Sequence, residues 1–391
     1  MDNGSPMQPG QFTQQPSDSQ PQPEAQIPYA GQSSYSEQTS YAGQDPYAVQ
    51  PPYYAAPPMY DMKPHRRNFS RIGFSYTLFS IVTYSLQIAA GIVIRLVAPS
   101  LLDNYLALIL FSIIPMYLFA APATALSMKR VPSEKPERKK YGPAQLIGGF
   151  FVVYAAVYAG NFIGIMIGTM IESMLPWARA ATNQVQDLAT EGEMAVNIVV
   201  MVFIGPVIEE LLFRKLLCDR LRIYGEFTAV LISGLMFGLF HGNVTQGIYA
   251  TLFGFALAFI YLKSGNIYIT IGYHMAVNFI GGVIAVLVNR ALDITEFLEL
   301  SENADYADVV AYVENNIGGF VFLMGYVAFS IGSMIAGLVI FIVCLATGRI
   351  KFAQGRVKLP EGRRFSTMIV NFGMISFLAI CAFEIFMSFF T

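Results

Sequence analysis

Charge is scarce in this chain of 391 residues, of which 54% are hydrophobic and only 13% are charged. A soluble globular protein carries roughly 25% charged residues, about twice that share. So few charges could not cover a globule of this size in water, which excludes a soluble enzyme. The formal net charge of -2 at pH 7 also excludes a nucleic-acid-binding protein, because such proteins present a strongly basic surface.

Cysteine is also rare in the sequence, where Cys218, Cys344 and Cys381 lie far apart. They form neither a CxxC metal motif nor a disulfide framework. We interpret them as small, buried apolar side chains.

The first 60 residues contain no leucine, lysine or arginine. Residues 1–68 are instead rich in Gln, Pro, Ser and Tyr, and a tyrosine recurs every six residues from Tyr29 to Tyr53. Such a segment buries too little apolar surface to offset the entropy of ordering, so we expect a disordered, cytoplasmic tail. It has neither the basic start nor the apolar core of a secretory signal peptide.

Residues 69–391 are predicted to form an all-α, polytopic transmembrane helical bundle, because lipid leaves the backbone of each apolar run no hydrogen-bond partners outside a helix. About nine runs are long enough to be spans, at about 72–98, 105–127, 145–171, 195–217, 227–241, 246–262, 266–289, 318–347 and 367–390. The fifth and sixth are short and joined only by Gly242 and Asn243, so they could instead form a re-entrant pair. Small residues at every fourth position of the third, fifth and sixth runs indicate the tightly packed centre of the bundle.

The basic residues fall on one side of these spans. If the amino terminus is cytoplasmic, 21 of the 24 lysines and arginines face the cytoplasm, as the positive-inside rule requires. The acidic loop at 291–317 and the carboxyl terminus then lie outside. Together with the Gln- and Tyr-rich tail, this bias predicts a multi-pass protein of a bacterial plasma membrane.

Ionisable side chains within apolar runs are candidate functional residues, because each costs at least about 2.5–3.5 kcal/mol to insert. The candidates on the fourth, fifth and seventh runs are Glu209, His241 and His274, with Asn278 one helical turn after His274. Glu210 and Arg214 are spaced i, i+4, the favourable order for an ion pair, and are expected to brace Glu209. Glu209 is turned about 100° from Glu210 on a helical wheel and can face a different neighbour.

This set of residues suits the hydrolysis of a carbonyl compound. A carboxylate beside an imidazole can hold a water molecule and take its proton, and a second imidazole with a carboxamide can donate to the developing oxyanion. Glu209, His241 and His274 could instead bind a divalent metal such as zinc, although no HExxH pair shares one helix. A transporter that uses the same residues as a solute or ion site is the alternative from another class. We find no internal repeat of the kind that many transporters show.

The sequence resembles the CPBP family of intramembrane proteases, which includes the type II CAAX prenyl endopeptidases and bacterial bacteriocin self-immunity proteins. The three motifs of that family, EExxxR, FxxxH and HxxxN, occur in order on successive apolar runs. They are Glu209-Glu-Leu-Leu-Phe-Arg214, Phe237-Gly-Leu-Phe-His241 and His274-Met-Ala-Val-Asn278. The similar region runs from about residue 145 to 290.

The resemblance implies an all-helical membrane endopeptidase that cleaves a membrane peptide or protein within the bilayer. It implies that Glu209 is the general base together with His241, and that His274 and Asn278 form the oxyanion hole. Glu210 and Arg214 would hold the fourth span in place. Family members have been described both as metalloproteases and as metal-independent glutamate proteases, and we expect the glutamate mechanism without a cofactor, because an Asn donor is more common than an Asn metal ligand.

Overall fold

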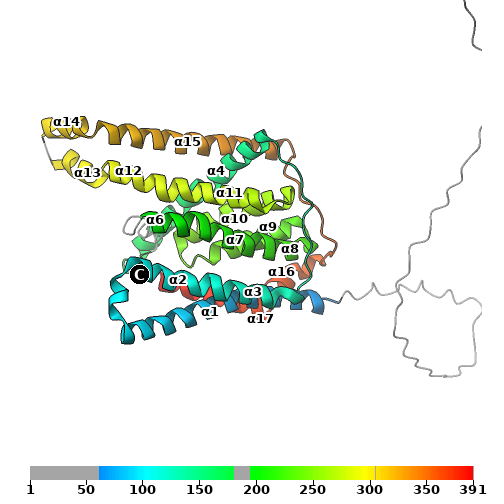
Figure 1. Ribbon diagram of the computed structural model, residues 1–391. Coiled ribbons are helices and arrows are strands. Elements are labelled where there is room, and N and C mark those ends of the chain that lie inside the picture. Colours follow the sequence, from blue (N-terminus) through cyan, green and yellow to red (C-terminus); the bar gives the residue numbers. More distant parts are fainter. Residues whose placement is uncertain (1–60, 180–193, 304, 391) are drawn as a thin grey trace, which may run out of the picture. The chain divides into compact units, whose positions relative to one another are not determined.

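The computed structural model describes residues 61–179, 194–303 and 305–390. All regular secondary structure in these ranges is helical, which confirms the all-α fold (Figure 1). The expected disorder of the tail concerns residues 1–60, outside the described part. The first helix, α1 (Lys63–Val97), begins before residue 69 because Pro64 fits its first turn and the Asp61 side chain accepts a hydrogen bond from the Lys63 amide.

Among the described residues, seven helical segments are long and apolar enough to cross a membrane. They are α1, Tyr105–Arg130, α4 (Pro143–Met174), Met194–Tyr224, α10 (Val244–Ser264), Ile267–Ala291 and α15 (Ile317–Ala346). Glu361–Met368, which includes α16 (Arg364–Met368), and α17 (Phe372–Met387) are joined at a 58° bend and make an eighth span if the pair crosses as one. The bundle is therefore polytopic, as expected.

Three of these spans contain π-helical turns. Tyr105–Arg130 consists of α2 (Tyr105–Ile114), the π-helix η2 (Pro115–Ala120), α3 (Ala121–Ser127) and a final 3-10 turn. Met194–Tyr224 consists of α6 (Met194–Asn197), the π-helix η4 (Ile198–Ile204), α7 (Gly205–Glu210), the π-helix η5 (Leu211–Cys218), α8 (Asp219–Leu221) and a final 3-10 turn. Ile267–Ala291 consists of α11 (Ile267–Asn278), the π-helix η7 (Phe279–Ile284) and α12 (Ala285–Ala291).

The predicted fifth span is the main difference from the expected nine. Its helix, α9 (Glu226–Leu239), has 14 residues, whereas a span needs about 20. It is bounded by Gly225 with φ 110° and by a turn in which Gly242 has φ 70°, conformations that favour glycine. Its partner α10 has 21 residues and is long enough to span.

The acidic segment at 291–317 is not a plain loop. It contains α13 (Ile294–Asn303) and α14 (Tyr306–Asn315), which lie together at one end of the bundle beside α12 and α15 (Figure 1). The Tyr312 hydroxyl donates to the backbone carbonyl of Asp293, and the Tyr312 ring packs with Phe297 and Phe320. The acidic side chains are thus carried on an ordered pair of helices.

The centre of the bundle is formed by α4, α9 and α10, as the small-residue stripes indicate. Gly160 of α4 lies directly against the backbone of Tyr249 on α10. Gly234 of α9 lies against Gly254 of α10. A side chain at any of these glycines would separate two backbones, so the glycines allow the close approach.

Helices α1 and α17 pack side by side and run in the same direction. Arg66 donates to the carbonyl of Val370 at 2.8 Å, and the Ser70 hydroxyl accepts from the Gly373 amide at 3.0 Å. Further along, the Tyr84 hydroxyl bonds the Glu384 carboxylate. Because the pairing advances along both helices together, the first and last described helices begin at the same end of the bundle, and α17 finishes at the other.

The basic loops meet at one end of the bundle. Glu134 pairs with Arg222 at 2.8 Å and with Arg356 at 2.7 Å, which joins three loops. Glu226 pairs with Lys263 and also accepts from the backbone amide of Ala353 at 2.8 Å. The basic loops that the sequence assigned to one side of the membrane therefore lie at the same end of the bundle. That this end faces the cytoplasm stays a prediction.

Candidate active site

Both glutamates of the first motif lie at the end of α7, a six-residue helix between two π-helical segments. Pro206 is the second residue of this short helix, and its missing N–H breaks the regular hydrogen-bond ladder of the span. Single π-helical turns inside α-helices are frequent at functional sites. Glu210 is fully buried, whereas the Glu209 side chain is 27% exposed.

Glu210 and Arg214 form the expected ion pair inside the bundle. Glu210 Oε2 lies 3.2 Å from Arg214 Nε, and neither side chain is exposed. The N–H of Arg214 is not aligned for a hydrogen bond, so the contact is an ion pair by distance alone. The guanidinium also lies 4.7 Å from the centre of the Phe237 ring, a cation–π contact that partly compensates its burial.

His274 lies between the two glutamates. Its Nδ1 is 3.1 Å from Oε1 of Glu210, and its Nε2 is 3.7 Å from Oε2 of Glu209. The ring is 3% exposed and packs edge-on against Phe253 and Phe237. Nδ1 is within hydrogen-bond distance of Glu210, and Nε2 faces Glu209 across a gap longer than a direct hydrogen bond. A gap of this length is one that a water molecule can bridge.

His241 lies in the turn between α9 and α10. Its Nδ1 is 2.7 Å from the carbonyl oxygen of Phe237, and its ring packs edge-on against the Phe237 ring. This backbone contact engages Nδ1 and orients the ring. The ring interacts electrostatically with both Glu209 and His274. The ionisable side chains of the fourth, fifth and seventh predicted runs, Glu209, His241 and His274, are thus in one part of the bundle.

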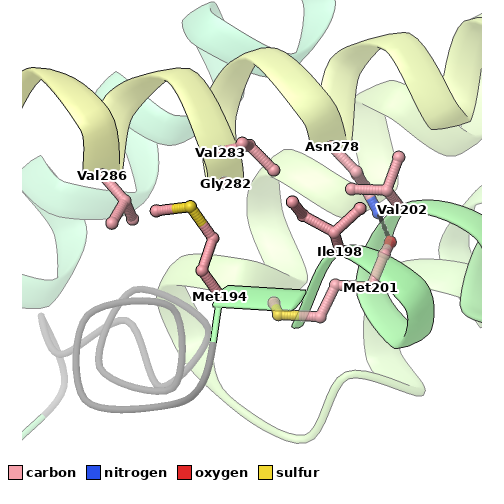
Figure 2. A pocket seen from close by; sticks show the side chains of 8 residues that line it. All are labelled: Met194, Ile198, Met201, Val202, Asn278, Gly282, Val283 and Val286. Carbon is pink, nitrogen blue, oxygen red and sulfur yellow. Dashed lines mark hydrogen bonds between the residues drawn. The ribbon is translucent and has the colours of Figure 1, made fainter. Parts of the chain in front are cut away.

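Asn278 occupies a neighbouring position, one turn further along α11. Its Nδ2 donates to the carbonyl oxygen of Met201 at 2.8 Å and so joins α11 to η4 (Figure 2). Asn278 also lines a small cavity with room for about one water molecule. The other lining residues are Met194, Ile198, Met201, Val202, Gly282, Val283 and Val286. One of the two amide N–H groups of Asn278 is therefore engaged by the backbone.

Three polar residues near this site were missed from the sequence. Tyr117 of η2 and Tyr249 of α10 both interact electrostatically with Glu209. Glu384 of α17 accepts hydrogen bonds from Tyr84 and Ser80, and its side chain lies against Gly242, the residue after His241. Glu384 could have been found by the rule that singled out Glu209, because it is an ionisable residue in an apolar run. A tyrosine in a span gives no such signal.

The expected metal ligands do not fit a metal site as they lie in the structure. His241 and His274 each have an acceptor at Nδ1, as metal-binding histidines typically do. However, the described residues contain no group of three or more His, Cys, Asp or Glu side chains placed to hold one ion. Glu209, His241 and His274 would have to move to bind it.

Comparisons with known proteins agree with the motifs. Residues 191–280 match the family model of type II CAAX prenyl endopeptidase Rce1-like proteins, and this range includes all three motifs. The chain is also 34% identical over 82 residues to the "Putative membrane peptidase YdiL" of Bacillus subtilis (strain 168). That match covers 21% of this chain and about a third, 34%, of the relative. No solved structure matches the chain. Together the two matches confirm the resemblance of this multi-pass membrane protein to the CPBP family of intramembrane proteases.

Proposed function

We propose that this protein is an intramembrane endopeptidase that hydrolyses a peptide bond of a membrane-associated peptide or protein. The observation that carries the proposal is the placement of His274 between Glu209 and Glu210 inside an apolar bundle, with His241 beside them. Such a group of ionisable side chains is costly in lipid and is rarely retained without a function. The motif match and the membrane peptidase relative support the same reaction class.

In this proposal Glu209 is the general base. Its side chain is partly exposed, and it faces Nε2 of His274 across 3.7 Å. His241, held by the Phe237 carbonyl, interacts electrostatically with Glu209. A water molecule held by Glu209 and His241 would lose a proton to Glu209 as its oxygen attacks the peptide carbonyl carbon. The proton would then pass to the amine nitrogen as the C–N bond breaks.

Glu210 and Arg214 are proposed to position the catalytic residues. Glu210 accepts from Nδ1 of His274, which fixes the ring with Nε2 toward Glu209. The same arrangement, a carboxylate that orients an imidazole, serves in serine hydrolases. Arg214 compensates the charge of Glu210 in a place that water does not reach.

His274 and Asn278 are the proposed oxyanion donors, as the resemblance implies. Asn278 has a second N–H group besides the one that bonds Met201. We further propose that the reaction is of the glutamate type without a resident metal. The protein is also proposed to reside in a bacterial plasma membrane, with its amino terminus in the cytoplasm and its carboxyl terminus outside.

The test is proteolysis by the purified full-length protein in detergent or lipid nanodiscs, with a panel of membrane peptides as substrates. Glu209→Gln is expected to lower the cleavage rate by about 10²–10⁴-fold, since the general base is lost. Glu314→Gln on α14 removes an exposed carboxylate far from the motifs along the chain and serves as the matched control. Equal cleavage by Glu209→Gln and wild-type protein would refute the proposal. Solute uptake in proteoliposomes without proteolysis would favour the transporter instead.

A further inference from the structure

A tyrosine from outside the matched segment faces the proposed base. Tyr117 lies on η2, the π-helical turn that starts at Pro115 in the second span. A methyl group placed on Gly205 would lie 3.4 Å from the Tyr117 hydroxyl oxygen and 3.7 Å from Oε1 of Glu209. The two oxygens thus border one space beside Gly205, and the two side chains interact electrostatically.

The two oxygens of Glu209 have different neighbours. Oε2 faces Nε2 of His274, whereas Oε1 is the oxygen near Tyr117. A water molecule or a substrate carbonyl held at Glu209 would therefore have the imidazole on one side and the phenol on the other. Because position 205 is glycine, it has no side chain of its own in this space.

The Tyr117 hydroxyl has no hydrogen-bond partner among the described residues, and Tyr117 is partly buried. The hydroxyls of Tyr76 and Tyr273, two other tyrosines of the bundle, are paired. Tyr76 donates to the Leu212 carbonyl at 2.8 Å, and Tyr273 donates to the Leu146 carbonyl at 2.6 Å. Tyr117 therefore offers a free donor beside Glu209.

The reaction needs such a donor. Asn278 already uses one N–H on the Met201 carbonyl, and Nδ1 of His274 is engaged by Glu210. Both expected oxyanion donors are thus partly occupied in the structure. The loss of one donor to a developing oxyanion typically lowers the rate by about 10²–10³-fold, so an additional donor has a large effect.

We propose that Tyr117 is a catalytic residue that donates a hydrogen bond to the substrate carbonyl oxygen. This inference rests on the proposed function. As the water oxygen bonds the carbonyl carbon, Glu209 takes the proton and the carbonyl oxygen becomes negative, hydrogen-bonded by the Tyr117 hydroxyl. When the C–N bond breaks, the C=O bond forms again and the proton moves from Glu209 to the amine. Tyr117 keeps its own proton throughout.

The test compares Tyr117→Phe with Tyr158→Phe, which removes a phenol hydroxyl that bonds Tyr326 in another part of the bundle. Tyr117→Phe is expected to lower kcat by about 10²-fold with KM nearly unchanged. It is also expected to weaken the binding of a peptidyl phosphonate, which mimics the tetrahedral intermediate, by the same factor as it lowers kcat/KM. Tyr158→Phe is expected to cleave like the wild type. Equal thermal unfolding temperatures in detergent establish that the Tyr117 variant is folded.

Two results would overturn the inference. The first is a kcat of Tyr117→Phe within twofold of the wild type. The second is a lower kcat with unchanged phosphonate affinity, because the hydroxyl would then act through Glu209 and not on the oxyanion. Glu209→Gln is assayed in parallel, so that a failure of the Tyr117 inference can be told from a failure of the proposed function. An inactive Glu209 variant beside a fully active Tyr117 variant refutes only the role of Tyr117, whereas an active Glu209 variant refutes both.

Discussion

Nδ1 of His274 lies 3.1 Å from Oε1 of Glu210, and this contact fixes the imidazole between two consecutive carboxylates. The other oxygen of Glu210 faces Arg214, so one fully buried carboxylate joins a cation to the imidazole of His274. The first motif thus supplies the proposed base, the group that orients its neighbouring histidine, and the counter-charge for that group. This relationship makes stability and activity separable by mutation.

Glu210→Gln is expected to lower the free energy of unfolding by about 3–5 kcal/mol, because it leaves the buried Arg214 charge without its partner. The double variant Glu210→Gln/Arg214→Met is expected to recover a large part of this loss, since no buried charge remains. It should stay inactive, because His274 has lost the carboxylate that orients it. Thermal unfolding in detergent and peptide cleavage measure the two effects. A double variant no more stable than Glu210→Gln would contradict this account.

Asn278→Ala is expected to lower stability by about 1–3 kcal/mol, because the Met201 carbonyl in η4 loses its donor. It should also reduce kcat by about 10²-fold if the second N–H serves the oxyanion. Met201→Ala is the matched control, since it keeps the backbone carbonyl and hence the hydrogen bond. Unfolding temperatures and kcat are compared for both variants. The proposed catalytic role of Asn278 fails if the two variants cleave at the same rate.

Much of the fold was predictable because membrane helices are long and apolar. The fifth span was not, because hydropathy does not show where Gly225 and Gly242 end α9. The number of candidate spans therefore falls slightly below the predicted nine. Helices α13 and α14 were also missed, since short acidic helices have the composition of a loop.

The site residues stood out because ionisable groups are rare in apolar runs, and the same rule should have found Glu384. Their contacts were harder to predict. A helical wheel turns Glu209 away from Glu210, yet both carboxylates face His274, at its two different nitrogens. Tyr117 reaches Glu209 from a span without a motif, and no sequence pattern distinguishes it from a packing tyrosine. Such contacts depend on how the spans pack, and on π-helical turns that change the direction of side chains.

Gly205→Ala is expected to reduce cleavage at least about tenfold, because its methyl group would occupy the space between Tyr117 and Glu209. Stability should change by no more than about 1 kcal/mol, because the helix propensity of alanine offsets a tight contact with the Val200 carbonyl at 3.2 Å. Gly332→Ala on α15, where a methyl group meets no atom within 4 Å, is the control. Wild-type cleavage by Gly205→Ala would show that this space is not used in the reaction.

Removal of metal ions is expected to leave cleavage unchanged within about twofold if Glu209 and His241 alone activate the water. The purified protein is dialysed against a strong chelator, and metal content and cleavage are measured before and after. A readdition of zinc serves as the control for recovery. One equivalent of zinc per chain, with loss of cleavage on removal and recovery on readdition, would contradict the glutamate mechanism. Glu209, His241 and His274 would then be the ligands to mutate.

Gly242→Ala tests whether the turn after α9 places His241. Gly242 has φ 70°, and a methyl group there would lie 3.3 Å from Cβ of Glu384. Gly348→Ala is a close control, because Gly348 has φ 64° but meets no atom within 4 Å. Both substitutions force an unfavourable backbone conformation and are expected to cost about 1–2 kcal/mol of stability.

Only Gly242→Ala is expected to reduce cleavage, by about tenfold or more, because the methyl group pushes the turn away from Glu384 and moves the adjacent His241 ring. Cleavage rates and unfolding temperatures of the two variants are measured side by side. If both variants lose stability equally and both cleave at the wild-type rate, the contact between Gly242 and Glu384 does not control the position of His241. A selective loss in Gly242→Ala would identify α17, which lies outside the matched segment, as part of the support for the active site.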